Sequence, residues 1–196
     1  NRGDGLNEMG DYLPAVDLGS GRTAKAIVAG ESHTCAILDN SAIKCWGRSN
    51  EGQMGKGPKF GPTWQIGDGS NEMGNNLTAI ELGTTATAIA AGKYHNCAIL
   101  DNSSIKCWGS NTAGQLGLGD SNNRGDLDSL GSSEMGDNLP AVDLGAGRTA
   151  RAISAGDRHT CVVLDNTSLK CWGKNESGQL GLGNTSNRGD NSSEMG

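Results

Sequence analysis

The stretch His95-Asn-Cys-Ala-Ile-Leu-Asp-Asn-Ser-Ser-Ile-Lys-Cys-Trp-Gly109 determines how this chain is organised, because the chain contains three versions of it. The first version spans residues 33–47 and the third spans residues 159–173. Each holds two cysteines at the same spacing, followed by Trp-Gly, and each follows a short Ala-Ile-x-Ala-Gly run. Self-similarity at a fixed period indicates a repeat architecture. We therefore interpret the chain as an array of one unit of about 62 residues.

Each unit predicts several short strands and no helix. Short apolar runs bounded by turn residues are typical of strands joined by hairpins. The apolar runs at 13–18, 77–82 and 139–144 raise the count to about four strands per unit, which is the size of one antiparallel propeller blade. The other predicted strands are residues 24–29, 33–38 and 43–46, residues 86–91, 95–100 and 105–108, and residues 150–155, 159–164 and 169–172.

These units predict an all-β fold of tandem four-stranded propeller-type blades, either an incomplete propeller or an open superhelical array. We place the repeats at residues 1–61, 62–123 and 124–187, with the start of another linker at 188–196. The segment Asn1-Arg-Gly-Asp4 recurs at residues 187–190. Because the chain starts and stops at one phase of the repeat, we expect it to be an excerpt from a longer array or the repeating unit of an assembly.

Composition limits the classes of function. The 196 residues include 16 Lys and Arg against 22 Asp and Glu, for a net charge of −6. A nucleic-acid surface needs clustered basic charge, so we expect no nucleic-acid partner. No apolar stretch is long enough to cross a bilayer, so we expect no membrane insertion. With 32 glycines and few aromatic residues, thin blades fit better than one thick core.

The six cysteines and six sequons predict a secreted or cell-surface glycoprotein. If residues 38 and 42 flank a three-residue loop, Cys35 lies opposite Cys45, within reach of a disulfide. An even number of regularly spaced cysteines indicates an oxidising compartment. The expected pairs are Cys35–Cys45, Cys97–Cys107 and Cys161–Cys171. Asn-x-Ser/Thr acceptors for N-linked glycans occur at Asn76, Asn102, Asn166, Asn175, Asn184 and Asn191.

Residues 88–120 strongly resemble the repeat of the regulator of chromosome condensation family, in its cysteine-bearing, secreted form. The shared features are Ala-Ile-Ala-Ala-Gly-x-x-His-x-Cys, Lys-Cys-Trp-Gly and Gly-Gln-Leu-Gly-Leu-Gly-Asp, with their spacing. The resemblance covers over half of the chain. It implies four-stranded propeller blades and a family of interaction platforms, which includes a nucleotide exchange factor and inhibitors of bacterial enzymes.

This chain departs from the family pattern in three ways. The family's closed ring has about seven blades and this chain has three, while its linkers are longer than usual. Ser41, Ser103 and Thr167 occupy the hairpin position where the family has glycine. If the turn is unchanged, these residues must adopt a left-handed conformation at some energetic cost.

Several residues suggest chemistry, and for each we prefer a structural interpretation. His33, His95 and His159 could be catalytic or zinc ligands, but they occur one per blade, whereas zinc ligands converge on one point. We expect each histidine to hydrogen-bond to nearby backbone. The glycines at 117–119 lack the Lys-Ser/Thr and the helix of a phosphate loop, so we expect them to permit tight bends. We expect Trp46, Trp108 and Trp172 to pack between adjacent blades instead of forming an interface hot spot.

The linkers carry two further candidate motifs. Arg-Gly-Asp, the cell-adhesion tripeptide, occurs at residues 2–4, 124–126 and 188–190, and we expect solvated turns there. Calcium is the one candidate ion, because oxygen ligands cluster in two linkers, although their spacing matches no calcium loop. These clusters are Asp120, Asn122, Asn123 and Asp126, and Asp4, Asn7, Glu8 and Asp11. We expect no other cofactor.

Together these observations predict a non-enzymatic, secreted structural glycoprotein whose blades assemble into an extracellular or cell-surface filament. Its partners would be copies of itself or further repeats of the same chain. The alternative is a fragment of a closed seven-bladed ring that binds a protein or glycan. An enzyme is the least supported class, because no unit carries acidic or nucleophilic residues that the others lack.

Overall fold

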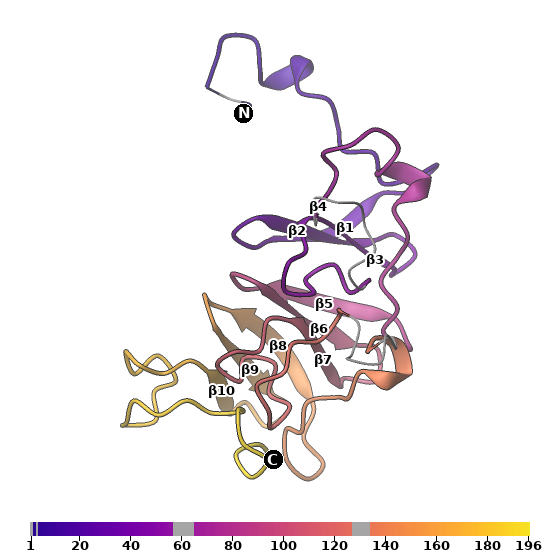
Figure 1. Cartoon of the computed structure of the whole chain (residues 1–196). Helices are drawn as coiled ribbons and strands as arrows, with labels where there is room; N and C mark the ends of the chain where they lie inside the picture. The colour runs from indigo at the N-terminus through magenta and orange to yellow at the C-terminus, as the bar shows by residue number, and fades with distance from the viewer. Residues whose placement is uncertain (1, 3, 57–64, 127–133) are drawn as a thin grey trace.

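The computed structural model describes residues 2, 4–56, 65–126 and 134–196, which form three antiparallel sheets stacked one on the next (Figure 1). Blade 1 comprises β1 (Ala24–Ala29), β2 (His33–Leu38), β3 (Ile43–Arg48) and β4 (Gln65–Ile66). Blade 2 comprises β5 (Ala86–Ala91), β6 (His95–Leu100) and β7 (Ile105–Gly109). Blade 3 comprises β8 (Ala150–Ala155), β9 (His159–Leu164) and β10 (Leu169–Gly173). The predicted all-β fold of propeller-type blades is confirmed.

The first two strands of every blade have the predicted bounds, and the third begins at the predicted residue. β3, β7 and β10 then run one or two residues past the tryptophan. The hairpin has the predicted three-residue loop, since Leu38 N–H donates to Ala42 O over 2.8 Å. Ser41, Ser103 and Thr167 take the left-handed conformation, with φ of 64°, 62° and 68°. In each loop the preceding asparagine side chain accepts a backbone N–H two residues on, which stabilises the turn.

The predicted fourth strand was wrong. The apolar runs at 13–18, 77–82 and 139–144 are not strands of these sheets. The fourth position is taken by β4 in blade 1, and by single β-bridges at Arg124 in blade 2 and Arg188 in blade 3. The run at 77–82 instead lies between blades, where Leu77, Ile80 and Leu82 are buried and Ile80 N–H donates to Ile43 O over 2.8 Å. Ile80 thus forms one isolated antiparallel bridge with Ile43, and the apolar pattern of the run reflects its burial between the two sheets.

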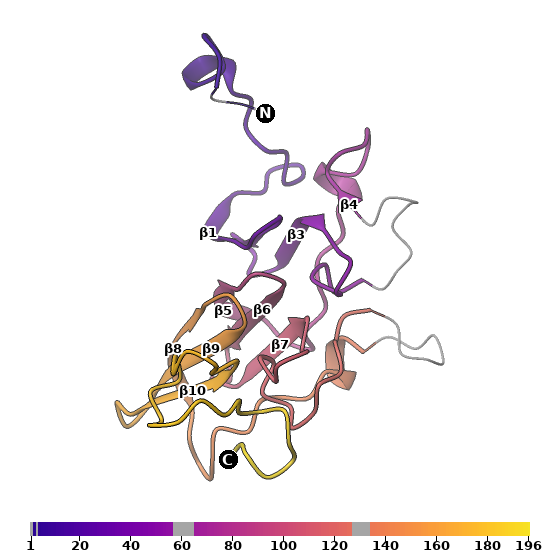
Figure 2. The ribbon, with the colours of Figure 1, turned by 60° about the vertical axis from the view of Figure 1, so that its left-hand side comes forward.

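The described parts of the linkers contain three 3-10 turns: η1 (Gly10–Tyr12), η2 (Gly74–Asn76) and η3 (Gly136–Asn138). η2 and η3 lie along one side of the stack, whereas η1 stands away from blade 1 with the N-terminal segment (Figure 2). Lys44, in β3, ties the linkers to its blade by donating to Leu18 O and Gly74 O, each over 2.8 Å. Lys106 makes the same pair of bonds to Leu82 O and Gly136 O.

The core is divided between two joints, and no single centre holds it. One cluster of buried side chains, including Ile43, Leu77 and Trp108, joins blade 1 to blade 2. A second, including Ile105 and Trp172, joins blade 2 to blade 3. Each blade therefore buries apolar side chains against its neighbour, as in other repeat proteins.

Candidate functional site: the joint between blades

Each joint is organised around a tryptophan. Trp108 of blade 2 is fully buried, and its Nε1–H donates to Gln53 O of blade 1 over 2.9 Å. Trp172 of blade 3 repeats this contact with Gln115 O of blade 2 at 3.0 Å. The expectation that tryptophan packs between blades is therefore confirmed for these two residues. Trp46 occupies the same position in blade 1, where no blade precedes it among the described residues, and it is only half-buried.

The histidines connect consecutive blades. His33 Nε2 lies 2.9 Å from Asn96 Oδ1, and His95 Nε2 lies 3.0 Å from Thr160 Oγ1. The Asn96 and Thr160 side chains then donate to Gln53 O and Gln115 O, the carbonyls that also accept from the tryptophans. The predicted structural role holds, but the predicted backbone partner was wrong. The partner is a side chain of the next blade, over 60 residues away in sequence.

The glycine before each histidine gives the ring its space. A Cβ on Gly92 would lie 2.1 Å from His95 Cε1, and one on Gly30 would lie 2.2 Å from His33 Cε1. The glycine of the repeated Ala-Gly pair is therefore required by the position of the histidine ring. This spacing was visible in the sequence as a repeated pattern, but its cause is a close approach that only the structure reveals.

Burial keeps the joint histidines uncharged. Burial, together with a smaller effect of the nearby His33 and His159, lowers the pKa of His95 to about 3. Burial also lowers the pKa of His33, against the opposing effect of its bond to Asn96. Thr160 gives its hydroxyl proton to Gln115 O, so His95 Nε2 carries the hydrogen of the bond between His95 and Thr160. A neutral ring satisfies this network, whereas a proton on Nδ1 would place a charge in the core.

Acidification is therefore expected to destabilise the chain through His95. The pKa of His95 is about 3 when folded, against 6.5 as an ordinary histidine, so its stabilising effect is complete above pH 6.5 and is lost as the pH falls toward 3. Between pH 7 and pH 5 this residue alone should remove about 2 kcal/mol from the free energy of unfolding. Urea unfolding of the native chain and of His95→Gln at both pH values measures this contribution.

The difference between the native chain and His95→Gln separates the contribution of His95 to the pH dependence of stability from that of the other titrating groups. Burial beside Asp126 raises the pKa of Glu134 to about 7, which favours the folded state at low pH, but this effect is common to both proteins. Equal losses of stability in the two proteins would show that His95 does not carry the pH dependence.

The disulfides lie within the hairpins that form the joints. Cys35–Cys45, Cys97–Cys107 and Cys161–Cys171 are bonded, each with a Cα–Cα distance of 4.1 Å. In every blade the two cysteines are directly opposed across the second and third strands, as predicted. The bonds of blades 1 and 2 are fully buried, but that of blade 3 is partly exposed because no described residue covers its outer side.

The Arg-Gly-Asp segments at 124–126 and 188–190 are docked on blades. Arg124 and Gly109 exchange two backbone hydrogen bonds, of 2.7 and 3.0 Å, and the Arg124 side chain contacts Asp120 at 2.6 Å. A Cβ on Gly125 would lie 2.5 Å from Gly52 O, so this glycine allows the linker to reach the preceding blade. The tripeptide therefore completes a sheet instead of forming the solvated turn we expected. Gly3 of the first copy lies outside the described residues.

The oxygen clusters proposed for calcium are engaged within the protein. Asp120 Oδ1 accepts from Asn122 N–H, Asp120 Oδ2 contacts Arg124, and Asn123 Oδ1 accepts from Asn111 N–H. In the N-terminal cluster, Glu8 accepts from Asp4 N–H and Gly5 N–H. Within the described part of the chain, no group of three or more His, Cys, Asp or Glu side chains could hold a metal ion.

The sequons differ in exposure. Asn175 is 0% exposed; its Nδ2 donates to Asn184 O and Ser186 O, and its Oδ1 accepts from Leu180 N–H. Because the folded blade uses both ends of this amide, it leaves no room for a glycan at Asn175. The other five acceptors are exposed: Asn76, Asn102, Asn166, Asn184 and Asn191.

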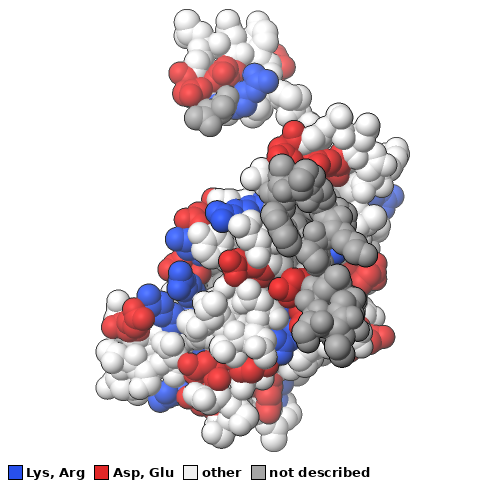
Figure 3. Space-filling view, viewed as in Figure 1, with Lys and Arg blue, Asp and Glu red and all other residues white. Residues whose placement is uncertain are grey.

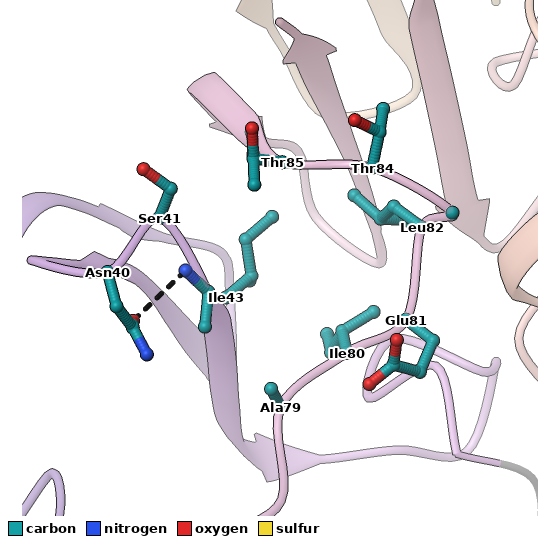
Figure 4. A pocket seen from close by; sticks show the side chains of 12 residues that line it. Asn40, Ser41, Ile43, Ala79, Ile80, Glu81, Leu82, Thr84 and Thr85 are labelled. Carbon is teal, nitrogen blue, oxygen red and sulfur yellow. Dashed lines mark hydrogen bonds between the residues drawn. The ribbon is translucent and has the colours of Figure 1, made fainter.

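A groove of about 240 Å³ opens beside the first joint (Figure 4). The hairpin tip of blade 1, with Asn40, Ser41 and Ile43, forms one side, and the segment from Ala79 to Ala86 forms the other. Glu81 is the one carboxylate of the lining, and no histidine, cysteine or lysine accompanies it. On the face seen in Figure 3, acidic and basic residues are interspersed.

No described helix has the length and apolarity needed to span a bilayer. Repeated antiparallel blades, joined by tryptophan and histidine, define a propeller-type repeat protein. One model of the regulator of chromosome condensation (RCC1) repeat matches residues 24–53, 86–115 and 150–179, and a second model of the same repeat matches residues 107–163. The chain belongs to this family.

The ultraviolet-B receptor UVR8 of Arabidopsis thaliana is 30% identical over 168 residues, which are 84% of this chain and 32% of that protein. The human probable E3 ubiquitin-protein ligase HERC6 is 31% identical, over 81% of this chain and 14% of its own length. The chain thus spans a third or less of these relatives. Two solved structures share the fold. Human WBSCR16 superimposes with a TM-score of 0.67 at 17% identity, and the match covers 87% of this chain and 38% of WBSCR16. Prp20p of Saccharomyces cerevisiae superimposes with a TM-score of 0.64 at 20% identity, and the match covers 86% of this chain and 37% of Prp20p.

Proposed function

We propose that this chain is a non-enzymatic structural repeat protein that assembles into an extracellular or cell-surface filament by packing blade on blade. The observation that supports this proposal is that one set of contacts, in which a tryptophan donates to a glutamine carbonyl of the preceding blade, joins blade 1 to blade 2 and again blade 2 to blade 3. The outer sides of blades 1 and 3 expose side chains whose equivalents are buried at the internal joints. A repeat protein of this kind continues to bury apolar surface as units are added.

The chemistry of the described residues favours a structural role. His33 and His95 are occupied by bonds across the joints, and the cysteines are oxidised. Three disulfides favour an oxidising environment such as the cell exterior. Five exposed sequons support N-linked glycans on the outside of the array, without Asn175.

A closed ring that acts as a binding platform is the second candidate. The observation that favours it is the fit of three blades onto 38% of WBSCR16 and 37% of Prp20p. Prp20p is described as having binding properties to Gsp1p and histones, so a protein with this fold has protein partners. In this hypothesis, further blades complete the ring and its loops bind a protein or glycan.

Electron microscopy of the native material, without refolding, distinguishes the two candidates. The filament proposal expects long, regular particles with an axial repeat that matches a whole number of blades. Discrete round particles with about seven blades in their circumference would reject the filament and support the ring.

A further inference from the structure

The segment that leads into blade 2 is two residues shorter than the segments that lead into blades 1 and 3. Blades 1 and 3 have Gly19-Ser-Gly-Arg-Thr23 and Gly145-Ala-Gly-Arg-Thr149, whereas blade 2 has Gly83-Thr-Thr85. The last threonine of each segment occupies one position, because its carbonyl accepts from the backbone N–H of the aspartate that follows the second strand. Thr84 therefore stands where the other two blades have arginine.

The missing arginine leaves an aspartate of blade 2 without a cation. In blade 1, Arg22 lies 3.4 Å from Asp39, and in blade 3, Arg148 lies 3.3 Å from Asp165. Asp101 is the equivalent aspartate of blade 2. Within the described parts of the chain, no lysine or arginine forms an ion pair with it.

Asp101 is nevertheless held in place and ionised. The Thr84 hydroxyl lies 2.9 and 3.0 Å from its two oxygens, and the Thr85 hydroxyl donates to Oδ2 over 2.9 Å. These bonds, that of Thr84 first, lower the pKa of Asp101. Asp101 is exposed, so its fixed negative charge is open to a cation from outside the chain.

The groove of about 240 Å³ lies where this shorter segment passes the hairpin tip of blade 1. At the second joint, Ala150 N–H donates to Ser103 O over 3.1 Å and ties the leading segment of blade 3 to the hairpin tip of blade 2. The equivalent groups at the first joint are Ala86 N–H and Ser41 O. The structure describes both residues, and no bond joins them. The first joint is therefore open where the second is closed.

The groove has an apolar floor and an acidic end. Ile43 and Leu82 project toward each other between its two walls, and the Thr85 hydroxyl lies at the rim (Figure 4). That hydroxyl bonds to Asp101, and Glu81 of the lining is a second carboxylate. A cationic group on an apolar stem matches this arrangement in both polarity and charge.

Both walls of the groove, at residues 40–43 and 79–86, lie inside the chain. A further repeat packed by the same joint would meet the leading segment of blade 1 or the hairpin tip of blade 3, and it would leave these walls uncovered. The groove is thus a lateral feature of the stack, whether the array forms a filament or a ring.

We propose that this groove is a docking site for a partner protein that inserts an arginine side chain. The stem lies over Ile43 and Leu82, and the guanidinium pairs with Asp101, as arginine does within blades 1 and 3. Arginine suits the site better than lysine, because its planar fork donates to several oxygens at once. Ser41 O and Ala86 N–H bond to the backbone of the inserted segment. This inference goes beyond the proposed filament and does not rest on it.

A fluorescein-labelled peptide with the sequence of residues 146–150, Ala-Gly-Arg-Thr-Ala, is the probe, because it carries the arginine that blade 2 lacks. Fluorescence anisotropy measures its binding to the native 196-residue chain. The same peptide with glutamine in place of arginine is the control ligand. We expect saturable binding of the arginine peptide, at least about tenfold tighter than that of the glutamine peptide. Added salt should weaken it.

Asp101→Asn tests the carboxylate with little change of shape, because asparagine keeps an oxygen that accepts from the threonine hydroxyls. We expect the arginine peptide to bind this variant at least about tenfold more weakly. Asp165→Asn is the matched control, since Arg148 already pairs with that carboxylate. It should change the affinity by less than about twofold. Circular dichroism and thermal unfolding confirm that both variants are folded.

A graft closes the site from within. Replacing Thr84 with Ala-Gly-Arg, the sequence of residues 146–148, gives blade 2 the leading segment of blade 3 and its own arginine beside Asp101. The grafted chain should bind no arginine peptide and unfold at the native temperature or above.

The proposal is overturned if the native chain binds neither peptide or binds both equally. It is also overturned if folded Asp101→Asn or the folded graft keeps the native affinity; should the graft not fold, Asp101→Asn alone decides. None of these readouts requires self-assembly, so electron microscopy tests the filament separately.

Discussion

Reducing the three disulfides is expected to unfold this chain at room temperature. Each bond closes a loop with a sequence separation of 10 residues. Closing such a loop in the unfolded chain contributes about 2 to 3 kcal/mol, so three independent bonds contribute roughly 8 kcal/mol. A domain of ordinary stability has about 5 to 15 kcal/mol in total. Thin blades with small cores have little else to replace this contribution.

The order in which the bonds open is also expected from their burial. Cys161–Cys171 should be reduced first, because it is partly exposed, while the other two bonds are fully buried. Reduction with dithiothreitol, quenching with an alkylating reagent and peptide mass spectrometry follow each pair, and far-ultraviolet circular dichroism follows the fold. Simultaneous opening of all three pairs, or a fully reduced chain that keeps its sheets, would contradict this account.

Replacing Trp108 with alanine is expected to cost about 3 to 5 kcal/mol of the free energy of unfolding. The side chain is fully buried between blades 1 and 2, and its Nε1–H bonds to Gln53 O at 2.9 Å. Alanine leaves a cavity between two sheets, each of which is held by its own hairpin disulfide and can adjust little to fill the space. Denaturant unfolding of the oxidised protein measures the loss.

Trp46→Ala is the matched control, because Trp46 has the same place in blade 1 but is only half-buried. We expect it to cost less than about half as much as Trp108→Ala. Trp108→Phe should cost about 1 kcal/mol beyond the lost volume, because it removes one donor while Asn96 continues to satisfy Gln53 O. If Trp46→Ala and Trp108→Ala cost the same, tryptophan stabilises the blade itself and not the joint.

The strands and the disulfide register were predictable because both are local. An apolar run between turn residues indicates a strand, and a three-residue loop fixes which cysteines oppose each other. The fourth strand was not predictable. Gln65–Ile66 is too short for a pattern, and in blades 2 and 3 a single residue takes its place. The run at 77–82 has the composition of a strand because the two sheets around it bury it just as deeply.

The joint could be predicted in part. The position of Trp108 between blades followed from the repeat, but the partner of each histidine did not, since residues 33 and 96 meet only after two sheets stack. Asn175 lies in an Asn-x-Ser motif, but its side-chain amide is buried and hydrogen-bonds to the backbone of the following turn. Asn111 makes the equivalent bonds in blade 2, where it is no sequon, and comparing the two repeats could have identified this role.

Each sheet is completed by residues that follow its hairpin in the chain, and these residues are made after the hairpin during synthesis. As the chain leaves the ribosome, the hairpin of a blade emerges with both of its cysteines well before the residues that finish its edge, such as Arg124 for blade 2. The disulfide can therefore form while that edge is still open. The nascent chain then holds an oxidised but unfinished sheet, and the arrival of the next linker both closes it and starts the following blade.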